Sequence, residues 1–134
     1  MILVIGGAFQ GKKDYCAEAF HLSDNDFVEG GSATMEDLLQ ARAVSHFQDF
    51  IRREVKEGKD VMAHAKELAD RNPGVVIIAN EIGYGVVPAD AFDREYRETV
   101  GSVCTYLASR ADEVHRVICG VGTVIKKAPK KGTK

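Results

Sequence analysis

The sequence lacks the features of several large protein classes. It has no apolar run that approaches ~20 residues, the length that a membrane-spanning helix needs. The apolar start, Met1 to Ile5, is shorter than the hydrophobic region of a secretion signal and has no basic lead. We therefore expect a soluble, cytoplasmic protein without a membrane partner.

An excess of charge of one sign and paired cysteines are also missing. The 18 Lys and Arg residues are balanced by 20 Asp and Glu, so the net charge of -2 gives no general electrostatic reason to bind DNA or RNA. Cys16, Cys104 and Cys119 lie far apart, without the spacing of a zinc site or a disulfide framework. We expect reduced thiols, mostly in the core, and no nucleic-acid partner.

The residues that are present suffice for one domain of alternating strands and helices. With 134 residues, 45% of them hydrophobic, the chain can build one core but not two, and we interpret residues 1–126 as that domain. The apolar runs Met1–Ile5 and Val75–Ala79 are typical of strands buried on both faces of a parallel sheet. Helical patterns separate the strands, which predicts an α/β fold with a mainly parallel sheet. Residues 127–134 are lysine-rich and are expected to form a basic flexible tail.

Periodic apolar residues predict the helices. We expect a short helix from Lys12 to about Phe20 and then a brief strand, Phe27–Val28, that ends at Glu29. Apolar positions spaced by three and four from Leu38 to Val55 predict one long amphipathic helix. The remaining expected elements are a helix capped by Asp60, a helix that begins at Asp90 and a last strand from about Glu113 to Cys119.

A phosphate-binding pattern follows the first strand directly. Gly6, Gly11 and Lys12 have the spacing of a P-loop, in which glycines let backbone amides curl around phosphates and the lysine adds charge at the terminal groups. The next helix points its positive end at the same place. The alternative is a merely structural glycine turn. We predict nucleotide binding by the loop residues Gly6, Gly7, Ala8, Phe9, Gln10, Gly11, Lys12 and Lys13.

One position departs from the P-loop pattern. A serine or threonine whose hydroxyl ligates magnesium is expected where this chain has Lys13. An ammonium group donates hydrogen bonds but cannot ligate a metal ion. Magnesium binding is therefore weakened, rerouted or absent.

Polar residues also follow two other predicted strands, at the edge where α/β sheets place their ligands. Glu29 is a candidate catalytic residue that could hold magnesium or accept a hydroxyl proton; the alternative is a solvated strand-end carboxylate. Asn80 and Glu81 follow the second buried strand. Gly83 and Gly85 give their loop the freedom to approach a ligand, so we interpret it as a substrate loop.

The histidines give no such signal. They are scattered and none has a partner at metal-ligand spacing, so a surface or packing role is expected for each of His21, His46, His64 and His115.

Longer stretches resemble one known family, the bifunctional adenosylcobinamide kinase and adenosylcobinamide-phosphate guanylyltransferase of cobalamin biosynthesis. The segment Ile78–Pro88 resembles its Thr-Asn-Glu-Val-Gly-x-Gly-Ile-Val-Pro stretch, and Phe27-Val28-Glu29 looks like its Leu-Leu-Glu strand end. The start of the chain, Met1–Ala8, is also similar. So are the Ala-Asp-Glu-Val strand at Ala111–Val114 and the Gly-x-Gly at Gly120–Gly122.

The resemblance implies a RecA-like, three-layer P-loop fold, trimeric assembly and two activities. A kinase phosphorylates the aminopropanol hydroxyl of adenosylcobinamide, and a guanylyltransferase then adds GMP through a covalent histidyl-GMP. The family's guanylylated histidine lies in a segment that here shrinks to roughly His21–Asp26, so no histidine carries over. Guanylyl transfer is not expected.

The leading hypothesis is a shortened family member that binds ATP or GTP and acts in cobinamide salvage, as a kinase if it is catalytic. In that role Lys12 and the loop amides hold the β- and γ-phosphates, while Glu29 positions magnesium or the attacking hydroxyl. The alternative is a non-catalytic nucleotide-binding or regulatory subunit. Lys13 and the missing histidine segment favour this alternative.

Overall fold

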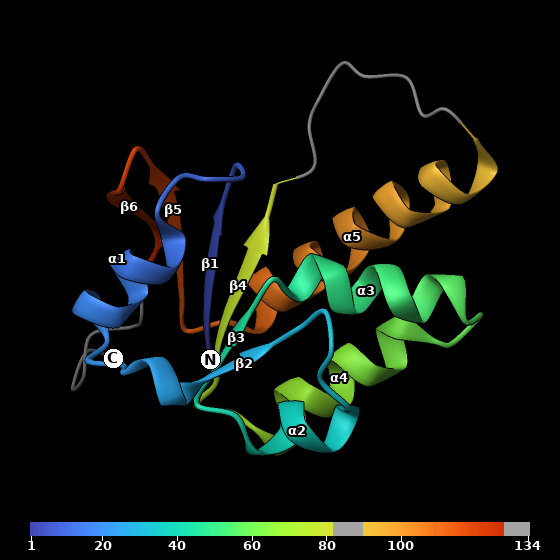
Figure 1. Cartoon of the computed structure of the whole chain (residues 1–134), viewed down its shortest axis with the longest axis horizontal. Helices are drawn as coiled ribbons and strands as arrows, with labels where there is room; N and C mark the ends of the chain where they lie inside the picture. Colours follow the sequence, from blue (N-terminus) through green and yellow to red (C-terminus); the bar gives the residue numbers. More distant parts are fainter. Residues whose placement is uncertain (82–89, 128–134) are drawn as a thin grey trace, which may run out of the picture.

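A computed structural model of the chain describes residues 1–81 and 90–127. Helices and strands alternate along most of it (Figure 1). The elements are β1 (Ile2–Gly6), α1 (Lys12–Ala19), a 3-10 turn η1 (Asp24–Asp26), β2 (Phe27–Glu29), α2 (Met35–Gln40), β3 (Ala43–Ser45), α3 (Phe47–Lys56), α4 (Val61–Arg71), β4 (Val76–Asn80), α5 (Ala91–Arg110), β5 (Glu113–Ile118) and β6 (Val121–Lys126).

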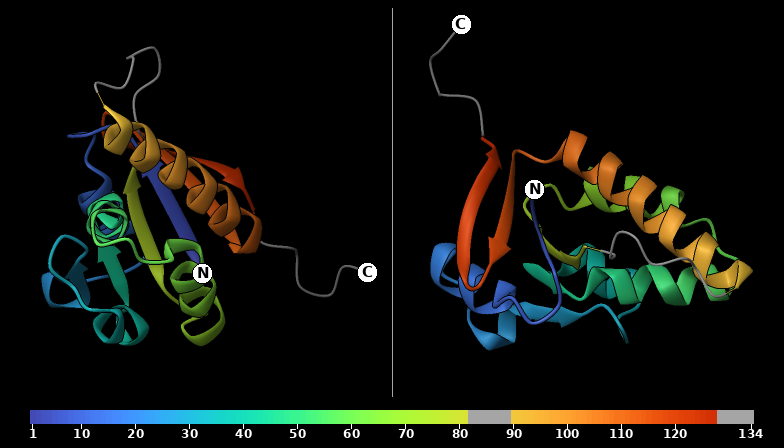
Figure 2. Two further views of the ribbon diagram at one scale, coloured as in Figure 1. Left: turned by 90° about the vertical axis from the view of Figure 1, so that its right-hand side faces the viewer. Right: turned by 90° about the horizontal axis from the view of Figure 1, so that it is seen from above.

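The six described strands form one sheet in the order β2-β3-β4-β1-β5-β6. All neighbours pair in parallel except β6, which is antiparallel to β5. Helix α1 covers one face and α3, α4 and α5 cover the other, which gives three layers (Figure 2). The predicted P-loop type of α/β fold with a mainly parallel sheet is confirmed.

Alternate residues of the central strands supply the two halves of the core. Leu3 of β1 and Ile77 of β4 face the larger cluster under α3 and α5, whereas Val4 and Ile78 face the smaller cluster under α1. All four are at most 3% exposed. Because burial of such a side chain is worth about 1.5–3 kcal/mol, these strands form a rigid support for the loops at their carboxyl ends.

Several helix boundaries agree with the sequence. Helix α1 begins at Lys12 as predicted. The side chains of Asp60 and Asp90 cap α4 and α5 by accepting hydrogen bonds from Ala63 N and Asp93 N. Within residues 1–81 and 90–127, no helix has the length and apolarity that crossing a bilayer requires.

The single long helix predicted from Leu38 to Val55 is wrong. Helix α2 ends at Gln40, strand β3 occupies Ala43–Ser45, and α3 starts at Phe47. Strand β3 lies between β2 and β4, and its side chains are buried on both faces, so it is as apolar as a buried helix segment. A run this short cannot be told from part of a helix by its periodicity.

The carboxyl end of the chain also differs from the prediction. The last predicted strand ends one residue early, at Ile118, and a second strand, β6, returns antiparallel to it after a turn at Cys119 and Gly120. Lys126 belongs to β6, and its Nζ donates to the carbonyl oxygens of Ala108 and Ser109. Residues 128–134 of the predicted tail lie outside the described residues.

Candidate functional site

The predicted phosphate loop connects β1 to α1. Lys12 is the first residue of α1 and only 7% exposed, and its Nζ donates to the Gly7 carbonyl oxygen at 2.6 Å. Burial lowers the pKa of the Lys12 ammonium, an effect that the nearby Glu81 carboxylate partly opposes. The lysine charge is therefore held inside the curve of the loop, where it faces little competing water.

The turn between β5 and β6 holds the loop from the other side. Backbone N–H groups of Cys119 and Gly120 donate to the side-chain and main-chain oxygens of Gln10, at 2.6 and 2.8 Å. Gly11 has φ +80°, and a Cβ there would lie 3.4 Å from the Gly120 Cα. A glycine at position 11 thus satisfies both the left-handed backbone and the close approach.

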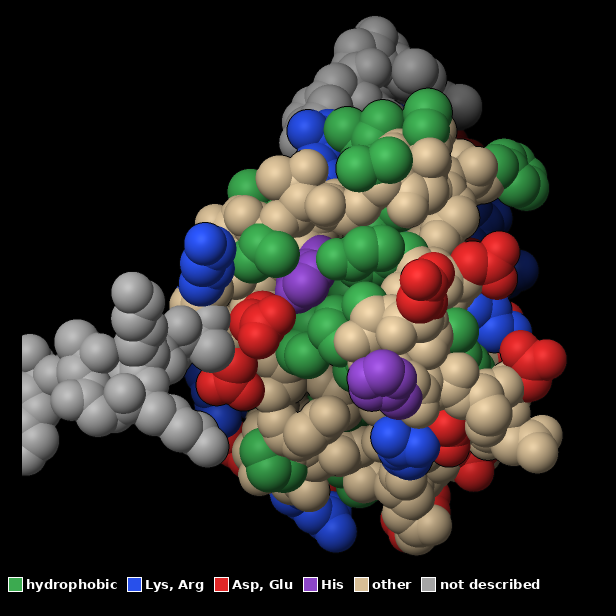
Figure 3. Space-filling view, turned by 90° about the vertical axis from the view of Figure 1, so that its left-hand side faces the viewer, with side chains coloured by type: hydrophobic (Ala, Val, Ile, Leu, Met, Phe, Trp, Pro, Cys, Tyr) green, Lys and Arg blue, Asp and Glu red, His purple; other side chains and the backbone are tan. Residues whose placement is uncertain are grey.

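A cavity of about 260 Å³ lies between this loop and the carboxyl ends of β3 and β4. Six of the eight predicted loop residues line it, from Ala8 to Lys13; Gly6 and Gly7 do not. Its other wall contains Ser45, His46, Ile78 and Asn80. The face that carries α1 and the β5–β6 hairpin mixes acidic, basic and apolar side chains (Figure 3).

Lys13 lines the cavity, but its ammonium is engaged by an aromatic ring. The Nζ lies 5.0 Å from the centroid of the Phe27 ring, a cation–π distance. The position that supplies a hydroxyl in a standard P-loop therefore supplies a cation, and the described residues do not reproduce the usual magnesium set.

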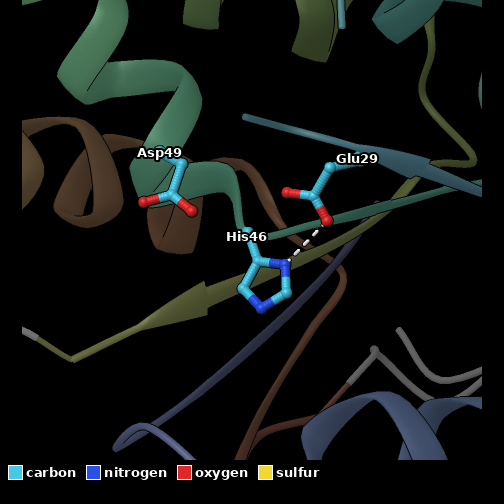
Figure 4. Close-up of side chains that lie close together, drawn as sticks. All are labelled: Glu29, His46 and Asp49. Atoms are coloured by element: carbon cyan, nitrogen blue, oxygen red, sulfur yellow. Dashed lines mark hydrogen bonds and ion pairs between the residues drawn. The ribbon is translucent and has the colours of Figure 1, made fainter. Parts of the chain in front are cut away.

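Glu29 and His46 meet at the ends of β2 and β3. Glu29 is paired with Ser45 in the sheet, and His46 follows Ser45 directly. The His46 Nδ1 lies 2.8 Å from Glu29 Oε2, and Figure 4 shows the other ring nitrogen, Nε2, pointing away from both Glu29 and Asp49. The imidazole is therefore fixed at one nitrogen, and no group within residues 1–81 and 90–127 bonds to the other.

Three donors hold the Glu29 carboxylate. Oε2 accepts from Ser45 Oγ at 3.3 Å in addition to its contact with His46, and Oε1 accepts from the Gly31 N–H at 3.1 Å. Burial raises the pKa of Glu29, but the hydrogen bonds from His46, Gly31 and Ser45 outweigh it, and the pKa is lowered overall. The carboxylate thus stays ionised beside the imidazole.

The backbone at this corner is tightly packed. His46 has φ 52° and ψ 49°, the left-handed conformation, at the junction between β3 and α3. Gly30 N donates to Ser45 O at 2.7 Å, and a Cβ on Gly30 would come within 2.3 Å of the His46 carbonyl oxygen. A glycine at position 30 lets β2 approach closely enough for Glu29 to reach the histidine.

Asp49, in the first turn of α3, completes a group of three metal-binding residue types. One ligand atom from each of Glu29, His46 and Asp49 lies within 4.8 Å of the others. Both Glu29 oxygens already accept hydrogen bonds, however, and Nε2 of His46 points elsewhere. The magnesium role predicted for Glu29 stays a prediction.

The predicted substrate loop is placed only in part. The Asn80 N–H donates to the buried Gln48 side chain at 2.9 Å, and the Glu81 carboxylate forms a two-point ion pair with Arg116 at 2.8 and 3.0 Å. Gly83 and Gly85 lie outside the described residues.

Sequence reasoning missed His46 and Asp49. The assignment of residues 38–55 to one helix hid the strand end that brings His46 to Glu29. The pair Gly30-Gly31, directly after Glu29, was the available signal for a close approach of backbones.

Comparisons with known proteins give one family. Residues 32–125 match the family described as "Cobinamide kinase / cobinamide phosphate guanyltransferase". Two relatives are named "Bifunctional adenosylcobalamin biosynthesis protein CobU": that of Salmonella typhimurium is 44% identical over 52 residues, and that of Escherichia coli is 42% identical over 52 residues. Each alignment covers 39% of this chain and 29% of the relative. The family match contains His46 and Asp49 and begins after the phosphate loop and Glu29.

Proposed function

We propose a function on the basis of the family, because this chain belongs to the cobinamide kinase / cobinamide phosphate guanyltransferase family. In this proposal the chain binds ATP or GTP and transfers the terminal phosphoryl group to the hydroxyl of adenosylcobinamide. The family belongs to cobalamin biosynthesis, and nucleoside triphosphates are its co-substrates. The observation that carries the proposal is the cavity between the phosphate loop and the ends of β3 and β4.

The nucleotide phosphates would take the place of the Gly7 carbonyl beside Lys12. The ammonium of Lys12, now held by that carbonyl at 2.6 Å, would turn to the β- and γ-phosphates, and the N-terminal amides of α1 would add their partial positive charge. The amides at the start of α1 are fixed by the helix before the nucleotide arrives, so they stabilise charge in the transition state without reorganisation.

The acceptor hydroxyl would enter from the side of Ser45, His46 and Asn80. In-line transfer needs the acceptor oxygen opposite the leaving nucleoside diphosphate. The phosphate loop forms the wall for the nucleotide, and the ends of β3 and β4 form the wall for the acceptor. A magnesium ion, when bound, would neutralise phosphate charge, and Lys13 supplies no ligand atom for it.

Isothermal titration with ATP and with GTP, each with and without magnesium, tests the binding step. We expect saturable binding that falls at least about tenfold in Lys12→Ala, since a buried charge-assisted contact is lost. Lys56→Ala, on the exposed surface of α3, is the matched control. Retention of binding in Lys12→Ala would count against the phosphate-loop assignment.

Incubation with adenosylcobinamide and nucleotide, followed by mass spectrometry, tests the transfer step. A product heavier by one phosphoryl group is expected. If Lys13→Ser gains turnover, the missing hydroxyl limits the reaction.

A second candidate function is a nucleotide-binding or regulatory subunit without catalysis. The cation that Lys13 places over Phe27, where a P-loop has a metal-ligating hydroxyl, favours it. Nucleotide binding without phosphorylated product would establish it. A trimeric state and a cytoplasmic location are further proposals, the first checked by light scattering and the second by cell fractionation.

A further inference from the structure

We infer that His46 is the catalytic base of the proposed phosphoryl transfer: its Nε2 takes the proton of the attacking hydroxyl, while Glu29 positions the ring through Nδ1. The inference rests on the proposed kinase activity. It assigns the proton transfer to a residue that no sequence motif indicated.

The orientation of the imidazole suits Nε2 to accept a proton. With Nδ1 2.8 Å from an ionised carboxylate, the favoured tautomer carries its proton on Nδ1 and donates it to Glu29 Oε2. The lone pair then lies on Nε2, which points away from both carboxylates (Figure 4). His46 lines the cavity that faces the phosphate loop, so its open nitrogen is available where an acceptor hydroxyl would bind.

The backbone of His46 is held in a conformation that costs free energy. A non-glycine residue in the left-handed conformation costs roughly 1–2 kcal/mol, and such residues concentrate at functional sites. The close contact of Gly30 with the His46 carbonyl keeps the backbone in this geometry. His46 is thus positioned by the main chain and by Glu29 at once.

His46 is better placed than Glu29 to act as the base. Both oxygens of Glu29 accept hydrogen bonds, from Ser45 and His46 on one side and from Gly31 on the other. Glu29 does not line the cavity, whereas His46 does. The carboxylate is suited to stabilise an imidazolium and the imidazole to receive the proton.

The step balances in atoms and charge. The hydroxyl oxygen forms a bond to the γ-phosphorus as the bond from that phosphorus to the β-phosphate oxygen breaks. The nucleoside diphosphate leaves with the electron pair, and the hydroxyl proton moves to Nε2 of His46. The charged groups around the imidazolium, among the described residues, are Glu29 on β2, Asp49 on α3, and Lys12, Lys13 and Asp14 on α1.

His46→Asn is the decisive variant, since asparagine tolerates the left-handed backbone. His21→Asn is the matched control, because His21 is exposed, also has positive φ (55°) and lies away from the cavity. With adenosylcobinamide and ATP or GTP, we expect kcat to fall about 100-fold or more in His46→Asn. Nucleotide affinity and KM should stay within about twofold, and the control should match the wild type. Glu29→Gln should lower kcat less, about tenfold.

Chemical rescue and NMR distinguish a base from a structural role. Added imidazole should restore part of the turnover of His46→Gly, and the ¹⁵N spectrum should show a proton on Nδ1 of His46 that depends on Glu29. Unchanged kcat in His46→Asn, no rescue, or a phosphoryl or nucleotidyl adduct on His46 would each overturn the assignment while the kinase activity stands. Absence of product from the wild-type protein would instead overturn the proposed function, and this inference with it.

Discussion

Two carboxylate–histidine pairs in this chain have the same contact distance and opposite surroundings. His46 with Glu29 and His115 with Glu113 are each joined at 2.8 Å. The His115 side chain is 6% exposed, and its second nitrogen is bound by the Tyr15 hydroxyl at 2.7 Å. The His46 side chain is 53% exposed and its second nitrogen points away from the carboxylates (Figure 4).

The difference shows that a carboxylate–histidine contact alone does not indicate chemistry. In the His115 pair both ring nitrogens are used, and the ring packs against Tyr15 and Phe20 with centroids 5.7 and 5.3 Å away. That arrangement stabilises α1 on the sheet. In the His46 pair one nitrogen remains for a ligand, beside a cavity. The occupancy of the second nitrogen separates the two roles.

The largest expected effect is on stability. His115→Ala removes a buried ring and leaves the Tyr15 hydroxyl and Glu113 without their partner, so we expect a loss of about 3 kcal/mol in the free energy of unfolding. His46→Asn should cost less than about 1 kcal/mol, because the side chain is exposed. Urea denaturation measures both. Equal losses in the two variants would contradict the comparison.

A methyl group at Gly30 should disturb the open pair without touching the buried one. The added Cβ would overlap the His46 carbonyl oxygen, which is backbone and cannot turn aside, so Gly30→Ala should cost about 1–3 kcal/mol. Gly31→Ala is the control, because its Cβ would meet only side-chain atoms, the nearest being Glu29 Oε1 at 3.3 Å. Similar unfolding midpoints for the two variants would show that β2 and β3 are not held as closely as the structure indicates.

A smaller effect concerns pH. The pKa of Glu29 is lower in the folded protein than its ordinary value of 4.5, so its carboxylate stabilises the fold above that value, and this stabilisation is lost as pH falls through the folded pKa. The stability difference between wild type and Glu29→Gln should therefore be largest near neutral pH and shrink below about pH 4.5. Urea titrations across this range measure it, with Glu18→Gln on α1 as a surface control. A difference that grows in acid would be contrary to this account.

The sequence predicted well those features that short local patterns determine. The apolar run of β1, the glycines and lysine of the loop, and the capping aspartates Asp60 and Asp90 each act through neighbours only a few residues away. Their predicted positions agree with the structure. Strand β6 is not predicted, because most of its residues are exposed and it has two glycines nearby: Gly120 in the hairpin turn and Gly122 within the strand.

The candidate site could be predicted only in part, because its key contact joins residues 17 positions apart. The contact between Glu29 and His46 depends on the register of β2 and β3, and β3 has only three residues within a helix-like pattern. A search for local ligand spacing cannot find such a pair. The local sequence motif thus predicted the wall of the cavity that the phosphate loop forms. The opposite wall depends on the pairing of strands that are distant in the sequence.

The smallest expected effect concerns the reactivity of the three cysteine thiols. Cys16 lies on the buried face of α1, in the same cluster as the rings around His115, and burial raises its pKa to about 12. Burial likewise raises the pKa of Cys104 to about 11, whereas Cys119 is exposed in the turn that holds the phosphate loop. Since the thiolate is the reactive form, the exposed Cys119 should react promptly with a disulfide reagent at pH 8. Cys16 and Cys104 should react only after unfolding. Prompt reaction of Cys16 would mean that the region around His115 opens to solvent. The buried His115 pair and the exposed His46 pair would then differ less in their access to solvent than the static contacts indicate.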